Sequence, residues 1–78
     1  MSMAPQELEK SASKYAAAAI RADSQGAAGM AITDYQNAAA ALLKLIRLYP
    51  TSSLNKIYKQ SYQKYQERIH ALRDSTGG

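Results

Sequence analysis

The chain has 78 residues, a formal net charge of +4, one histidine and no cysteine. A chain of this length forms one small domain, whose core supplies a stability of only about 3–5 kcal/mol. The lack of cysteine excludes a disulfide framework and a thiolate metal site, and we expect an intracellular, cytoplasmic protein. The positive charge is too mild to require a nucleic acid as the partner.

The first predicted helix covers residues 5–24. Pro5 suits the first turn of a helix, where its missing N–H costs nothing. Gly26 is typical of the position just after a helix, so we expect the helix to end near Ser24. Residues 1–4 are predicted to be a disordered N-terminus. The apolar side chains that recur at helical spacing, and are therefore expected to face the core, are Leu8, Ala12, Tyr15, Ala19 and Ala22.

A second, smaller row of side chains runs beside this core row of the first helix. Ser13, Ala16 and Ile20 are small or apolar and recur at helical spacing. This row either borders the core or forms one wall of a shallow groove for a partner. Spacing alone leaves both interpretations open.

The second predicted helix starts just after Gly26 and ends at Tyr49, because Pro50 pushes the residue before it out of the helical region. It is rich in alanine and leucine, which are strong helix formers. Its apolar residues cover so much of its circumference that it needs neighbours on more than one side. We therefore expect one helix packed on each side of it.

The third predicted helix is capped by one of the hydroxyl residues of the segment 51–53 and closes at Arg73 and Asp74. Residues 75–78 are predicted to be a linker or chain end. The two connections are short, so the sequence predicts an all-α, antiparallel up-down-up three-helix bundle over residues 5–74. The residues of the third helix expected to face inward are Leu54, Tyr58, Ser61, Tyr65, Ile69 and Leu72.

The sequence offers little material for catalysis. The six acidic residues are scattered over all three helices, and no pair has the spacing of metal ligands or an obvious neighbouring base. His70 is expected at the surface, and Gly26 and Gly29 do not fit a phosphate-binding loop. We expect no catalytic residue, no metal and no cofactor. The longest apolar run is interrupted by Lys44 and Arg47, so no membrane span is predicted.

Residues on all three helices resemble the MIT (microtubule interacting and trafficking) domain, and the likeness extends over residues 8–73. The turn sequence LIRLYP looks most like the MIT domain of the archaeal AAA ATPase used in cell division, an enzyme related to the vacuolar-protein-sorting ATPases. The first two helices alone also resemble a tetratricopeptide repeat. The residues that carry the resemblance are Tyr15, Ile20, Asp23 and Gly26, then Ala31, Ile32, Tyr35 and Ala38, and finally Tyr65, Arg68 and Leu72.

The resemblance implies a non-enzymatic adaptor domain that binds the C-terminal tails of ESCRT-III subunits. MIT domains take these tails either as a helix between the second and third helices or as an extended Pro-containing segment between the first and third. Gln66 and His70 depart from the residues that the helical mode uses, so we expect the extended mode. The positions implied for the peptide are Ser13, Ala16, Ala17, Ile20, Ile57, Ser61, Lys64 and Arg68.

For Arg68 a second interpretation stays open, which is a structural ion pair with Asp23 or Asp34. The resemblance further implies an oligomeric parent ATPase, a monomeric isolated domain and only indirect contact with membranes through the ESCRT-III-like polymer. Two other functions are weighed. One is a helical repeat fragment that binds another protein, and the other is a weak basic nucleic-acid binder, which is not expected. The latter uses the lysines Lys56, Lys59 and Lys64.

Overall fold

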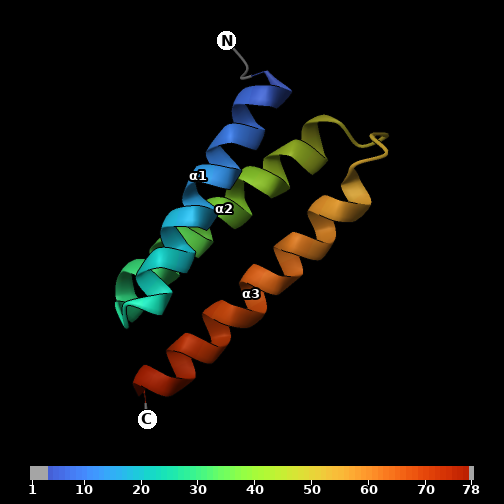
Figure 1. Ribbon diagram of the computed structural model, residues 1–78. Helices are drawn as coiled ribbons and strands as arrows, with labels where there is room; N and C mark the ends of the chain where they lie inside the picture. The colour runs from blue at the N-terminus through green and yellow to red at the C-terminus, as the bar shows by residue number, and fades with distance from the viewer. Residues whose placement is uncertain (1–3, 78) are drawn as a thin grey trace.

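The computed structural model describes residues 4–77, with the side chains of residues 4–75. It contains three helices, α1 (Pro5–Ser24), α2 (Ala28–Leu48) and α3 (Asn55–Gly77). Figure 1 shows that α1 and α3 run in the same direction and α2 in the opposite one. The predicted all-α, antiparallel three-helix bundle is therefore confirmed.

The turn between α1 and α2 depends on Gly26, which has a φ of +78°. Only glycine adopts this left-handed region without steric cost. The turn is closed by the N–H of Ala27, which donates to the carbonyl of Ala22 at 2.9 Å, and by the N–H of Gly26, which donates to Asp23 at 3.1 Å. The predicted end of the first helix at Ser24 is thus correct.

The third helix differs from the prediction at both ends. It begins at Asn55, after a turn in which the hydroxyl of Ser52 accepts the N–H of Leu54 at 3.2 Å. It continues to Gly77, past the predicted end at Asp74, because no proline or glycine interrupts the chain before that residue. The expected linker at 75–78 is therefore helical up to Gly77. Residue 78, and residues 1–3 of the expected disordered N-terminus, lie outside the described part of the chain.

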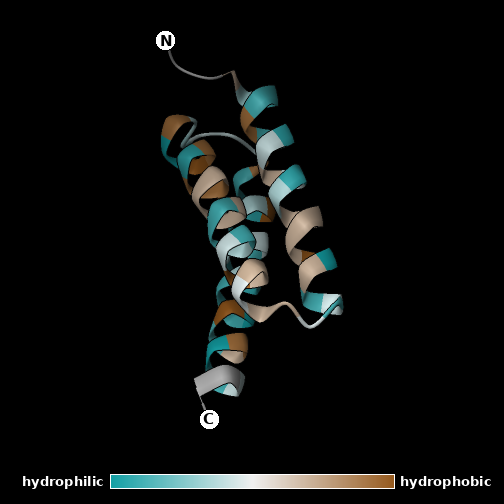
Figure 2. Ribbon diagram, turned by 90° about the vertical axis from the view of Figure 1, so that its left-hand side faces the viewer, coloured by the Kyte–Doolittle hydropathy of each residue, from teal (hydrophilic) through white to brown (hydrophobic). Residues whose placement is uncertain are grey.

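The core lies along α2, which has α1 on one side and α3 on another. Each helix alternates hydrophobic and hydrophilic residues along its length, as Figure 2 shows. One buried cluster centres on Tyr35 and Ile69, and a second on Leu8 and Leu45. The half-buried ring of Tyr65 packs against both clusters, and its centroid lies 5.7 Å from that of Tyr35. This ring therefore links the two halves of the core.

Two residues predicted to face the core are exposed instead. Tyr15 is 38% exposed and Leu54 is 45% exposed. Leu54 lies in the turn before α3 begins, so helical spacing does not govern its direction. Tyr15 lies beside α2 at the edge of the contact between α1 and α2, where its large ring extends beyond the small alanines around it. Spacing therefore identified the correct side of α1, but not the depth of this residue.

The first and third helices do not touch through their backbones. Among residues 4–77, every Cα of α1 stays more than 8 Å from every Cα of α3, whereas both helices pack closely on α2. The surface between α1 and α3 is therefore spanned only by side chains. The wide separation of the two backbones leaves space for a groove between α1 and α3.

Candidate functional site

A groove with a volume of about 370 Å³ lies between α1 and α3, and α2 forms its floor. The floor consists of Leu42 and Leu45, which are buried. On the α1 side the lining side chains Ala12 and Ser13 are small, which leaves space above the floor. On the α3 side Ile57 is 57% exposed, so an apolar surface is open to solvent. The groove can therefore bury apolar side chains of a ligand.

One hydrogen bond crosses this groove between the two helices. The hydroxyl of Tyr58 on α3 donates to a carboxylate oxygen of Glu9 on α1, and both residues line the groove. This bond to a carboxylate, helped by partial burial, raises the pKa of Tyr58 to about 12. Tyr58 therefore remains a neutral donor over the whole physiological range, and the bond holds α1 and α3 at a fixed spacing.

A second connection between α1 and α3 lies near the C-terminal end of α1. Arg68 donates from Nε and Nη2 to the two carboxylate oxygens of Asp23, both at 2.7 Å. The hydroxyl of Tyr35 on α2 donates to the same carboxylate at 3.0 Å. These bonds, with that from Arg68 the strongest, hold the pKa of Asp23 below its ordinary value of 3.8. Of the alternatives for Arg68, the ion pair with Asp23 is present.

The Asp23–Arg68 pair predicts an acid-dependent loss of stability. Because the pKa of Asp23 is lowered by folding, its contribution is complete above the unfolded-state pKa near 3.8 and is lost as pH falls through the folded-state value. The free energy of unfolding, measured with urea at about pH 6 and about pH 2.5, should fall less between these two conditions in Arg68→Gln than in the wild type.

Arg47→Gln is the control for this prediction, because Arg47 forms no ion pair among residues 4–75. It removes the same charge and should keep the acid dependence of the wild type. An equal dependence in wild type and Arg68→Gln would show that the Asp23 carboxylate is not stabilised by this partner.

The structure brings together three of the eight residues implied for peptide binding. Ser13, Ile57 and Ser61 line the groove. Ala16 is only 9% exposed and belongs to the core. Of the two interpretations for its row on α1, border of the core or wall of a groove, the first therefore holds at Ala16. A charged substitution there would disturb the fold as well as a ligand. The others lie outside the groove lining: Ala17, Ile20 and Lys64, which are exposed, and Arg68, which is held by Asp23.

Several lining residues were missed by the sequence reasoning. Leu54, Tyr58 and Tyr65 line the groove, although their spacing assigned them to the core. The signal that could have identified Glu9 is its position four residues before Ser13, on the same face of α1. The groove therefore lies nearer the N-terminal halves of α1 and α3 than predicted.

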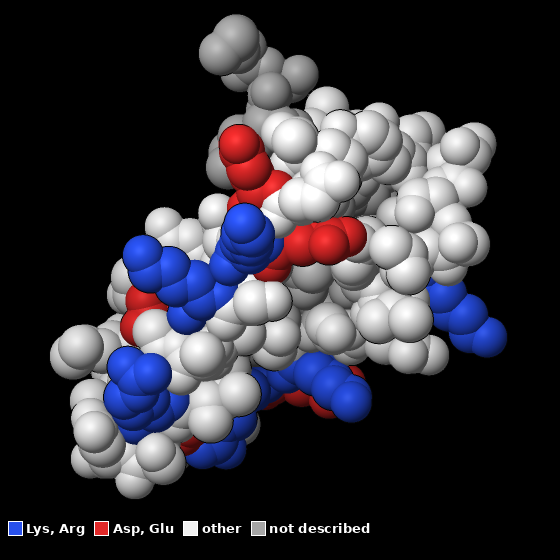
Figure 3. All heavy atoms as spheres, turned by 45° about the horizontal axis from the view of Figure 1, so that its top comes forward, with Lys and Arg blue, Asp and Glu red and all other residues white. Residues whose placement is uncertain are grey.

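The described residues form neither a cluster of metal ligands nor a helix suited to crossing a membrane. No group of three or more His, Asp or Glu side chains among the described residues is arranged to hold a metal ion. Lysine and arginine side chains are interspersed with acidic ones on the face in Figure 3. Within residues 4–77, none of the helices combines the length and the apolar character that a membrane crossing requires.

Comparison with known proteins gives one informative likeness. The chain is 45% identical over 53 residues to Cell division protein C of Sulfolobus acidocaldarius. The aligned residues make up 68% of this chain but 14% of that protein, so the chain spans only a small part of the relative's length. A stretch of 53 residues within this chain necessarily includes all of α2, the central helix of the bundle. No protein-family model matches the chain.

Proposed function

We propose that this chain is a protein-interaction domain that acts in cell division and recruits an AAA ATPase to filaments of ESCRT-III-like subunits. Two likenesses support the proposal. The sequence resembles MIT domains on all three helices, and it is similar to a protein named for cell division. The observation that carries the proposal is the groove between α1 and α3, because a surface groove with an apolar floor suits a short peptide.

The shape of the groove favours an extended segment that contains proline. Along α3 its lining runs from Ile57 to Tyr65, which is about 12 Å at a helical rise of about 1.5 Å per residue. An extended peptide covers that length with about four residues. Proline has no N–H, so a Pro-containing segment lies against the apolar wall at Ile57 with fewer unpaired donors than other extended segments.

A single domain should bind such a tail weakly. A dissociation constant in the micromolar range corresponds to about 8 kcal/mol of binding free energy. If the parent ATPase assembles as a ring, many copies of the domain engage many tails of one filament, and avidity supplies the strength that a single groove lacks. Weak individual contacts also allow the tails to be released as the filament is taken apart.

The test is a titration of the ¹⁵N-labelled chain with a synthetic Pro-containing peptide from the C-terminal tail of an ESCRT-III-like subunit. We expect chemical-shift changes to concentrate at Ser13, Ile57 and Ser61. Changes concentrated at Gln66 and His70, on the face used by the helical mode, would contradict the extended mode. The absence of any change at millimolar peptide would contradict the proposed function itself.

A further inference from the structure

A second and larger groove, with a volume of about 730 Å³, lies between α1 and α2 and is separate from the groove just described. The two grooves have no lining residue in common, although Leu8 of this groove and Leu45 of the other pack in the same buried cluster. One row of three side chains on α1 and two neighbouring rows of three on α2 line this second groove, and each row has the spacing i, i+3, i+7. The row on α1 is Leu8, Ser11 and Tyr15. Of the two rows on α2, one is Ala41, Lys44 and Leu48, and the other ends in Arg47.

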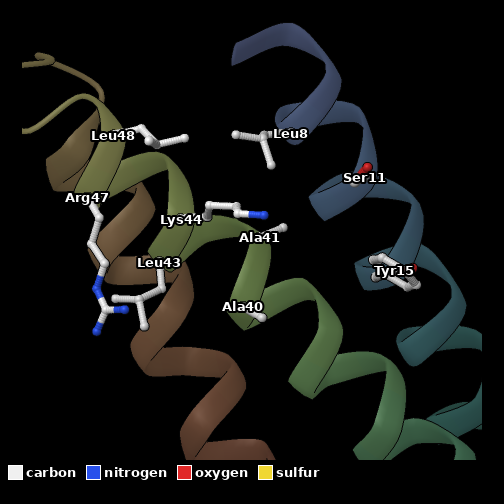
Figure 4. A pocket seen from close by; sticks show the side chains of 9 residues that line it. All are labelled: Leu8, Ser11, Tyr15, Ala40, Ala41, Leu43, Lys44, Arg47 and Leu48. Carbon is white, nitrogen blue, oxygen red and sulfur yellow. The ribbon is translucent and has the colours of Figure 1, made fainter. Parts of the chain in front are cut away.

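Figure 4 shows how these rows lie. Leu8 and Leu48 point toward one another across the groove, and Lys44 extends from α2 toward α1. Ala41 and Ser11 are small and leave the middle of the groove unfilled. Leu48 is 46% exposed, so its apolar surface is available to a ligand. The groove thus combines apolar ends with a hollow that fits the side chains of another helix.

The charges around this groove have one sign. Lys44 and Arg47 are the charged side chains that line it, and no acidic side chain does. Both are exposed, and neither forms an ion pair among the residues whose side chains are described. On the surface between α1 and α3, by contrast, Arg68 is already paired with Asp23. The unpaired cations around an apolar hollow are complementary to a ligand that carries both apolar and acidic side chains.

The same charges argue against a second copy of this chain as the occupant. A two-fold contact through this groove would place Lys44 and Arg47 of one copy close to the same residues of the other, and like charges facing each other are unfavourable. The net charge of +4 adds to that repulsion. A partner of opposite charge is therefore the better match.

We propose that the groove between α1 and α2 is a second docking surface, which takes an acidic amphipathic helix of a partner protein. The helix places its apolar side chains over Ala41 and Ser11, and its flanking carboxylates pair with Lys44 and Arg47. The proposal uses none of the residues that line the groove between α1 and α3, which we call the tail groove. It therefore stands whether or not the tail binds. A partner can then hold this domain while a filament tail occupies the other side.

The experiment uses a synthetic amphipathic peptide of about 18 residues, long enough to form a helix, with leucine at i, i+3 and i+7 and glutamate beside each leucine. A matched peptide replaces every glutamate with glutamine. Titrated into the ¹⁵N-labelled chain, the acidic peptide should shift the amides of Leu8, Ser11 and Ala41 and leave those of Ser13 and Ser61 unchanged. It should bind at least about tenfold more tightly than the glutamine peptide.

The double variant Lys44→Glu/Arg47→Glu should weaken binding of the acidic peptide at least about tenfold. The control variant Lys56→Glu/Lys59→Glu changes the net charge by the same amount on exposed positions of α3 and should leave the affinity near that of the wild type. An equal loss in both variants would reduce the effect to general charge attraction and overturn the proposal.

Three further results would also overturn it. The first is the absence of saturable binding by the acidic peptide. The second is a concentration-dependent dimer in sedimentation velocity that Lys44→Glu/Arg47→Glu alters, which would assign the surface to a second copy. The third is a single-stranded oligonucleotide that shifts the same amides as the peptide with higher affinity, which would assign the cations to nucleic acid. Repeating the peptide titration with the tail groove saturated separates failure here from failure of the proposed function.

Discussion

Replacing Leu45 with alanine is expected to leave most of the chain unfolded. Leu45 is 1% exposed and lies in the buried cluster with Leu8 and Leu42, below both α1 and α3. Truncation of a buried leucine costs about 2–5 kcal/mol through lost burial and the remaining cavity. A domain of this size has a total stability of only about 3–5 kcal/mol. Far-ultraviolet circular dichroism should show a large loss of helix.

Leu48→Ala is the matched control for this prediction. It removes the same atoms three residues further along α2, from a side chain that is 46% exposed. Its effect on the free energy of unfolding should stay within about 0.5 kcal/mol. Similar destabilisation by the two variants would mean that α2 does not have the central position described for it.

Replacing Ser61 with phenylalanine is expected to block tail binding while the bundle stays folded. Ser61 is half-buried and lines the groove between α1 and α3 in the middle of its α3 wall. A phenyl ring there occupies the space that an extended peptide needs. We expect the affinity measured by calorimetry or NMR titration to fall at least about tenfold, or about 1.4 kcal/mol.

Gln60→Phe is the control for Ser61→Phe. Gln60 is the preceding residue of α3, is exposed and does not line the groove. The same ring at this position should leave the affinity near that of the wild type. Unchanged binding by Ser61→Phe would show that the tail does not use this groove, and helical content and melting temperature report whether either variant disturbs the fold.

The fold could be predicted from the sequence because its signals are local and agree with one another. Pro5, Gly26 and Pro50 mark helix boundaries, and the apolar residues between them recur with the helical period. The end of α3 was placed too early because the composition of residues 75–78, which are Ser, Thr, Gly and Gly, indicated a linker from Ser75 onward. Polar residues do not end a helix when no proline or glycine forces the chain to turn.

The candidate site was predicted less accurately because its depth depends on distances between helices. Spacing places Ala16 and Ser13 on the same side of α1, but only the packing of α2 decides that Ala16 is buried and Ser13 exposed. Tyr58 was assigned to the core because it recurs at helical spacing with the inward-facing residues of the third helix. Its hydroxyl in fact reaches Glu9, which lies 49 positions away in the sequence, and no local pattern reports such a pair.

The two polar connections between α1 and α3 have a consequence for the speed and cost of binding. Tyr58 with Glu9 and Arg68 with Asp23 connect the two helices at a fixed spacing at two levels of the bundle. The groove is therefore open before any ligand arrives, and its walls lose little conformational entropy on binding. Most of the ordering then falls on the incoming segment, so association needs no prior opening of the bundle and exchange can be rapid.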